Sequence, residues 1–113
     1  MNVRAPALLT LTLLSTACTG MIQYASISEA YKTYDRGSYE KTLRLIAQAE
    51  NTRHLDVEQR VGLAYLKAQA HEGLGQADRA ATLYAYICEQ HPTSQYAYLI
   101  RDRQELTERA QAG

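Results

Sequence analysis

The chain has 113 residues, enough for one domain, and its 12 basic and 12 acidic side chains balance. A balanced charge gives no reason to expect electrostatic binding to nucleic acid or to an anionic surface. All nine aromatic residues are tyrosines, with no tryptophan and no phenylalanine. Because tyrosine joins an apolar ring to a polar tip, this composition favours half-buried positions and contact surfaces over a dry core.

The first seventeen residues have the layout of a secretory signal. Arg4 lies near the start, an apolar run extends from Ala5 to Leu14, and small residues lead to Cys18. The run is much shorter than the roughly 20 apolar residues that span a bilayer as a helix. We expect the segment to be removed, and the alternatives are a plain secretory signal with a chance cysteine or an uncleaved anchor.

Residues 14–18, LSTAC, resemble a bacterial lipobox, in which cleavage occurs just before a cysteine that carries lipid. The resemblance implies that Cys18 carries a thioether-linked diacylglyceryl group and an amide-linked acyl chain of the palmitate kind. Thr19 stands where lipoproteins kept in the inner membrane often have aspartate, so the resemblance implies the periplasmic face of the outer membrane. The expected divisions are residues 1–17 as signal peptide, 18–25 as lipidated tether and 26–113 as the helical domain.

Five helices are predicted in that domain, and no stretch of the sequence is typical of a strand. The expected helices cover residues 27–36, 39–50, 57–74, 77–90 and 95–111. Gly37 and Gly75 are expected to end the first and third helices, because glycine tolerates the left-handed conformation found there. Pro92 ends the fourth, since the residue before a proline disfavours helix.

Capping residues and apolar spacing support these helices. The expected caps are Ser26 with Glu29, Ser38, Asp56 with Gln59, and Thr93 or Ser94. The fourth helix has the most regular apolar face, formed by Ala77, Ala80, Ala81, Tyr84, Ile87, Cys88 and His91. In the second helix the spacing directs Leu43, Ile46 and Ala47 to the core. In the fifth helix we expect Leu99 and Leu106 to pack on the preceding hairpin.

The unit from Val61 to Ser94 has the length of a tetratricopeptide repeat and resembles one. Its matching residues are Ala68, Gly75, Ala80, Tyr84 and Pro92. An earlier copy starts near residue 23 and matches at Ala30, Gly37, Tyr39 and Ala49, with Thr42 in place of the usual alanine. The resemblance implies an all-α fold, a short tetratricopeptide-like α-solenoid of about two helical hairpins plus a C-terminal capping helix.

In tetratricopeptide domains the first helix of each repeat lines a concave groove that binds peptides. Carried over to this chain, the resemblance implies a groove formed by Tyr24, Ile27, Tyr31, Tyr34, Asp35, Tyr65, Gln69, Glu72, Tyr96, Leu99 and Arg103. Tyrosine and arginine are enriched at protein contacts because they offer large area and a polar end. The alternative is that Ile27, Tyr31 and Tyr34 are ordinary core residues at helical spacing.

The sequence predicts no catalytic or metal site. His54, His71 and His91 are scattered over a loop, a helix and a helix end. Cys88 and His91 are three residues apart, but further ligands for a metal are missing. No glycine-rich phosphate loop opens a helix. We therefore expect no enzyme activity, no metal and no cofactor.

The expected function is that of an outer-membrane-anchored periplasmic scaffold or adaptor. It would bind a partner protein through the concave face and the membrane through the lipid on Cys18. The resemblance suggests a role in an envelope assembly, secretion, pilus or polysaccharide-export machine. The first alternative is a self-associating structural subunit, whose tyrosine surface is buried by a second copy. The second is an enzyme or metal protein that uses Cys88 and His91.

Overall fold

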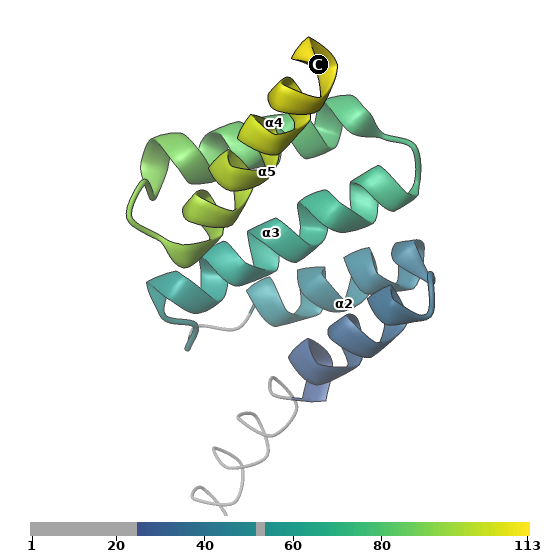
Figure 1. The fold of residues 1–113 in the computed structure, drawn as a ribbon. Helices are drawn as coiled ribbons and strands as arrows, with labels where there is room; N and C mark the ends of the chain where they lie inside the picture. Colours follow the sequence, from purple (N-terminus) through teal and green to yellow (C-terminus); the bar gives the residue numbers. More distant parts are fainter. Residues whose placement is uncertain (1–24, 52–53) are drawn as a thin grey trace, which may run out of the picture.

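The computed structural model describes residues 25–51 and 54–113, and this part of the chain is helical, with no strand (Figure 1). An N-terminal helix, described from residue 25, ends at residue 35. The other helices are α2 (Tyr39–Glu50), α3 (Val57–Gly73), α4 (Ala77–Gln90) and α5 (Gln95–Ala112). The expected all-α fold is confirmed, and the bounds of α2 and α4 match the expected ones. The expected signal peptide and lipidated Cys18 lie outside the described residues.

Both glycine turns adopt the predicted left-handed conformation, with φ of +78° at Gly37 and +75° at Gly75. At the first turn the N–H of Ser38 donates to the carbonyl of Thr33, and the N–H of Gly37 donates to that of Tyr34, both at 2.9 Å. The same pair of bonds recurs around Gly75. This is a Schellman motif, which satisfies the last carbonyls of a helix and turns the chain back. Two antiparallel hairpins result.

Two of the expected caps are confirmed. Asp56 and Gln59 form a reciprocal capping box at the start of α3, with bonds of 2.8 and 3.0 Å between side chain and backbone. The side chain of Ser94 accepts a hydrogen bond from the N–H of Tyr96 and so caps α5. These local signals fix where α3 and α5 begin.

Two other capping predictions are wrong. The helix already includes residue 25, so Ser26 lies within it and is not at its N-cap. Ser38 occupies the N-cap position of α2, but its side chain makes no capping bond. Its carbonyl instead accepts a hydrogen bond from the hydroxyl of Thr42, which also bonds the hydroxyl of Thr33, both at 2.9 Å. This buried pair explains why threonine replaces the expected small alanine at position 42.

α3 is the central helix of the described structure. It contacts α2 on one side and α4 and α5 on the other, and α4 also contacts α5 (Figure 1). One core cluster, between the N-terminal helix, α2 and α3, consists of Ala30, Ile46, Ala49, Leu55, Leu63 and Leu66. The second, between α3, α4 and α5, consists of Val61, Ala68, Ala80, Tyr84, Ile87, Ala97 and Ile100. Each hairpin thus buries an apolar face only where the next helix covers it.

Two glycines of α3 receive tyrosine rings from neighbouring helices. A Cβ atom at Gly73 would overlap the ring of Tyr39, and one at Gly62 would lie 2.8 Å from the hydroxyl oxygen of Tyr96. The overlap at Gly73 involves the Tyr39 ring itself, so only glycine leaves room for it, whereas at Gly62 the close atom is the hydroxyl tip of Tyr96. The two contacts set how α2 and α5 lie against α3.

The predicted inward faces of three helices need correction. Leu99 and Leu106 are 50% and 60% exposed, and α5 buries Ala97 and Ile100 instead. The reason is that Tyr96 docks against α3 and thereby fixes the rotation of α5 about its axis. In α2, Ala47 is exposed, while Thr42 and Ala49 are buried beside Ile46. In α4, Ala77 and Ala81 are exposed although they belong to the predicted apolar face.

Candidate partner-binding surface

Four tyrosines from four helices form a continuous row. Tyr31 of the N-terminal helix lies near Tyr96 of α5, and the neighbouring phenol contributes to the raised pKa of Tyr31. The ring of Tyr96 lies 5.3 Å from that of Tyr65 in α3, and Tyr65 lies 5.9 Å from Tyr84 in α4, measured between centroids. These separations are typical of favourable tilted ring pairs. The row therefore links segments that are distant in the sequence.

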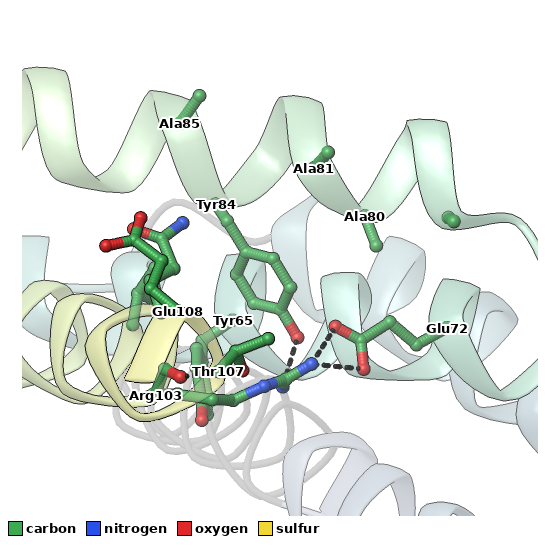
Figure 2. Close-up of a pocket in the computed structure, with 12 residues that line it drawn as sticks. Tyr65, Glu72, Ala80, Ala81, Tyr84, Ala85, Arg103, Thr107 and Glu108 are labelled. Carbon is green, nitrogen blue, oxygen red and sulfur yellow. Dashed lines mark hydrogen bonds and ion pairs between the residues drawn. The ribbon is translucent and has the colours of Figure 1, made fainter. Parts of the chain in front are cut away.

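An ion pair closes one end of this row (Figure 2). Arg103 of α5 donates from Nη2 to both carboxylate oxygens of Glu72 in α3, at 2.7 and 2.9 Å. Its Nη1 donates to the hydroxyl of Tyr84 at 3.4 Å, and its guanidinium carbon lies 5.5 Å from the centre of the Tyr84 ring. The arginine is thus held by a carboxylate and an aromatic ring in one fixed geometry.

Burial and neighbouring groups raise the pKa of three phenols in this region. For Tyr84 burial is the main cause, followed by the hydrogen bond to Glu72 and its negative charge, with Arg103 opposing them. Burial is also the main cause of the raised pKa of Tyr31, and the adjacent phenol of Tyr96 raises it further. The pKa of Tyr34 is likewise raised mainly by burial, and then by its neighbours Tyr39 and Glu72. These hydroxyls therefore keep their protons at neutral pH and can donate hydrogen bonds.

We call the surface formed by Tyr31, Tyr65, Tyr96, Glu72 and Arg103 the tyrosine face. Tyr31 is its most accessible tyrosine, with 42% of its surface exposed, while Tyr65 and Tyr96 are half-buried. All five residues were predicted groove residues, and the contacts above bring them together.

The other predicted groove residues lie elsewhere. Tyr24 is outside the described residues. Ile27 and Tyr34 pack against the first core cluster, as the core alternative expected for them. Asp35 is exposed, and Gln69 is half-buried on α3. Leu99 is exposed on α5.

A pocket of about 670 Å³ opens beside the ion pair, between α4 and α5, and we call it the wedge. It is lined by Tyr65, Glu72, Ala77, Ala80, Ala81, Tyr84, Ala85, Ile100, Arg103, Gln104, Thr107 and Glu108. Figure 2 shows that Tyr84 and Ala80 come from α4, Glu72 from α3, and Arg103 and Thr107 from α5. Three predicted groove residues therefore also border the wedge: Tyr65, Glu72 and Arg103.

Sequence reasoning missed the polar role of Tyr84, which it assigned only to packing. The Tyr84 ring does belong to the core, but its hydroxyl reaches Arg103, a residue 19 positions later. No spacing rule relates those two positions, because they come from different helices. The wedge was missed too, since the alanines of α4 were expected to be covered.

Of the residues that might carry chemistry, His71, His91 and Cys88 are held by structural contacts, and His54 is exposed. His71 is buried, and its Nδ1 lies 2.6 Å from the side-chain oxygen of Gln76. The ring of His91 packs edge-on against Tyr86, and Cys88 lies half-buried beside α5. Within residues 25–51 and 54–113 no three potential ligands gather around a possible metal position.

Comparison of the chain with protein-family models, with curated proteins and with solved structures gives no match. None of the helices in the described part of the chain is long and apolar enough to cross a bilayer.

Proposed function

We propose that this protein is a lipid-anchored adaptor of the bacterial outer membrane, which holds a segment of a partner protein on the tyrosine face. One observation carries the proposal: rings from four helices meet in a single row that ends at a fixed arginine–glutamate pair. Large aromatic rings with polar tips, next to an ordered arginine, are the residue types that dominate binding energy at protein interfaces.

The side chains of the tyrosine face are already ordered, which supports the proposed binding of a partner segment. Tyr96 is held against Gly62 and Tyr65, and Arg103 is held by Glu72, so few side chains need to be ordered when a partner binds. Each long side chain that is already fixed spares the entropy cost of immobilising it at the interface. Tyr31 is half-exposed at the edge of the row and is the natural first contact.

The architecture we propose is a short tetratricopeptide-like solenoid. It is supported by the two hairpins, whose Schellman turns recur at Gly37 and Gly75, and by α5, which covers the second hairpin. Lipid on Cys18 would hold the domain close to the periplasmic face of the membrane. Tethering raises the effective concentration of a partner near its machine, which suits envelope assembly, secretion, pilus or polysaccharide-export systems.

The proposal is tested by capturing partners from the cell envelope with the full chain and with the Tyr31→Ala variant. We expect capture to weaken by about tenfold, the effect of losing roughly 1.4 kcal/mol at a contact residue. Tyr86→Ala is the matched control, because Tyr86 is an exposed tyrosine on α4 outside the tyrosine face. Equal capture by both variants, with helical circular dichroism unchanged, would contradict the proposal.

The membrane location is tested separately with Cys18→Ser. If Cys18 carries the lipid, this variant leaves the outer-membrane fraction and is recovered as an unprocessed or soluble form. A variant that still fractionates with the outer membrane would show that the lipid assignment is wrong. The adaptor role on the tyrosine face would then need another means of localisation.

The alternative of a self-associating subunit is favoured by one feature of α5. Tyr98, Leu99 and Leu106 are at least half-exposed on this helix, so three large side chains with apolar surface are open to solvent among its charged residues. Light-scattering mass measurement of the full chain in detergent distinguishes the two functions. A monomer supports the adaptor, and a stable dimer that is broken by Leu106→Glu supports the subunit.

A further inference from the structure

The wedge has a counterpart inside the same chain. The two hairpins are in register when the turn glycines Gly37 and Gly75 are aligned. The helix that follows each hairpin also corresponds, because aligning buried Leu63 of α3 with buried Ala97 of α5 matches their inward faces. The same alignment matches Leu66 with Ile100, both buried. The packing of α2 on α3 can therefore be compared with that of α4 on α5.

At the first of these interfaces large side chains fill the space. Tyr39 is half-buried, and its ring lies directly on Gly73 of α3 and 5.6 Å from the ring of Tyr34. Leu43, one turn later on α2, is half-buried as well. The tyrosine ring thus occupies the place where α2 and α3 would otherwise leave a gap.

At the second interface the corresponding side chains are small. Ala77 and Ala81 stand in the register of Tyr39 and Leu43, and both are exposed. Thr107 stands in the register of Gly73, and it borders the wedge. Its side chain therefore takes part of the space that Gly73 leaves for the Tyr39 ring, and the wedge is the remaining opening beside Ala77 and Ala81.

We propose that the wedge receives an aromatic side chain, with tyrosine the best match, from the bound segment of a partner protein. This inference rests on the proposed adaptor function and specifies one residue of its partner. Its volume of about 670 Å³ lies in the usual range of ligand pockets. The alanine methyl groups of α4 provide an apolar wall for the ring.

The polar groups of the wedge match the tip of such a side chain. Glu72 can accept a hydrogen bond from a phenol and Gln104 can donate one, whereas the Thr107 hydroxyl already donates to the carbonyl of Arg103. Glu72 and Arg103 also belong to the tyrosine face, so a segment bound on that face lies directly next to the wedge. A site built to hydrogen-bond a hydroxyl discriminates in favour of the ligand that carries it.

The experiment uses the full chain in detergent, with alanine methyl groups labelled with ¹³C, and two capped peptides as probes. The probes are acetyl-Ala-Tyr-Ala-amide and acetyl-Ala-Ala-Ala-amide. We expect the tyrosine peptide to shift the methyl signals of Ala77, Ala80, Ala81 and Ala85 in a saturable manner. The exposed methyl of Ala47 on α2 and the trialanine peptide provide the controls, and neither should show a saturable shift.

A filled variant, Ala77→Tyr with Ala81→Leu, places the side chains of the first hairpin in the second. It should bind the tyrosine peptide at least about tenfold more weakly, because the introduced side chains occupy the space that the peptide's tyrosine ring would take. Ala47→Leu, an enlargement outside the wedge, should bind it normally. Circular dichroism establishes that both variants fold, and a filled variant that does not fold is replaced by Ala81→Leu alone.

Three results would overturn the inference. These are the absence of saturable shifts, equal shifts with trialanine, and unchanged binding in the filled variant. Concentration-dependent dimerisation lost on filling would instead assign the wedge to a second copy of the chain, which also overturns it. If the inference fails while Tyr31→Ala still weakens partner capture, the proposed function stands without it. Loss of both effects would remove the adaptor function as well.

Discussion

Tyr84 carries two roles in one side chain. Its ring is part of the second core cluster, and its hydroxyl accepts a hydrogen bond from Arg103 at the border of the wedge. Sequence spacing identifies such a residue as core, because the helical period reports the direction of the side chain and says nothing about its tip. The polar contact depends on how α5 crosses α4.

The raised phenol pKa values predict a loss of stability in alkali. The pKa of Tyr84 is above the ordinary 10.0 in the folded state, mainly through burial. Above pH 10 the unfolded chain releases this proton while the folded chain still holds it. The stabilisation is thus fully present below pH 10 and is lost as pH rises further. We expect urea denaturation to show this decline, and Tyr84→Phe to make it shallower.

A matched variant gives the control for that measurement. Tyr86→Phe removes an exposed phenol from the same helix and should leave the alkaline decline as steep as in the parent chain. If Tyr84→Phe also leaves the slope unchanged, Tyr84 is not a source of the pH dependence.

The contact of Tyr39 with Gly73 predicts strong coupling between these two positions. Gly73→Ala should destabilise the protein, because overpacking typically costs about 1–3 kcal/mol and exceeds the gain in helix propensity of about 1 kcal/mol. In a Tyr39→Ala background the clash is gone, so the same change should become stabilising by about 1 kcal/mol. Chemical denaturation of the four proteins of this cycle measures the coupling. Additive effects would refute the close approach.

At the scale of the element, the two turns depend on the backbone freedom of glycine. A Cβ atom at Gly75 would meet nothing within 4 Å, so a substitution there reports backbone strain alone. Gly75→Ala should cost about 1–2 kcal/mol, the penalty of the left-handed conformation. Gly75→Asn should cost less, since asparagine visits that conformation more readily. Equal costs, or none, in urea denaturation would mean that the turn relaxes to another conformation.

The C-terminal half of α5 is held mainly at one place. Every residue from 101 to 113 is exposed, and the pair of Arg103 with Glu72 ties this half to α3. Arg103→Met keeps the aliphatic stem and removes the charge. We expect several-fold faster amide exchange in residues 104–112 and a global loss below about 1 kcal/mol, as for other partly exposed ion pairs.

Arg109→Met is the control for that prediction. Arg109 pairs with Glu105 within α5 and does not reach another helix. Its loss should leave amide exchange in residues 104–106 unchanged. A uniform effect of both variants would mean that the pair with Glu72 does not anchor the helix.

Helix limits could be predicted because their signals are local. Gly37, Gly75 and the Asp56–Gln59 box each act within a few residues, and each prediction is confirmed. The buried face of α5 could not be predicted in the same way. Leu99 looked more apolar than Ala97, but the docking of Tyr96 on α3 decides the rotation, and that contact joins distant positions.

At the scale of the whole molecule, three alternate helices of the chain present one face. The N-terminal helix, α3 and α5 bring Tyr31, Tyr65 and Tyr96 together through contacts that run across the order of the chain. The sequence predicted these three residues as one surface only through alignment with a repeat. Nothing in the local pattern determines which ring touches which, because helix packing sets those distances. The same packing leaves the wedge open at the end of the row.

The central claim is that the tyrosine face holds a segment of a partner protein. The most direct test places a photo-crosslinking amino acid at Tyr31 or, as control, at Tyr86 of the full chain in living cells. Position 31 should give one discrete adduct that disappears when Tyr65→Ala is added, and position 86 should give none. Equal adducts at both positions, or none at position 31, would contradict the account.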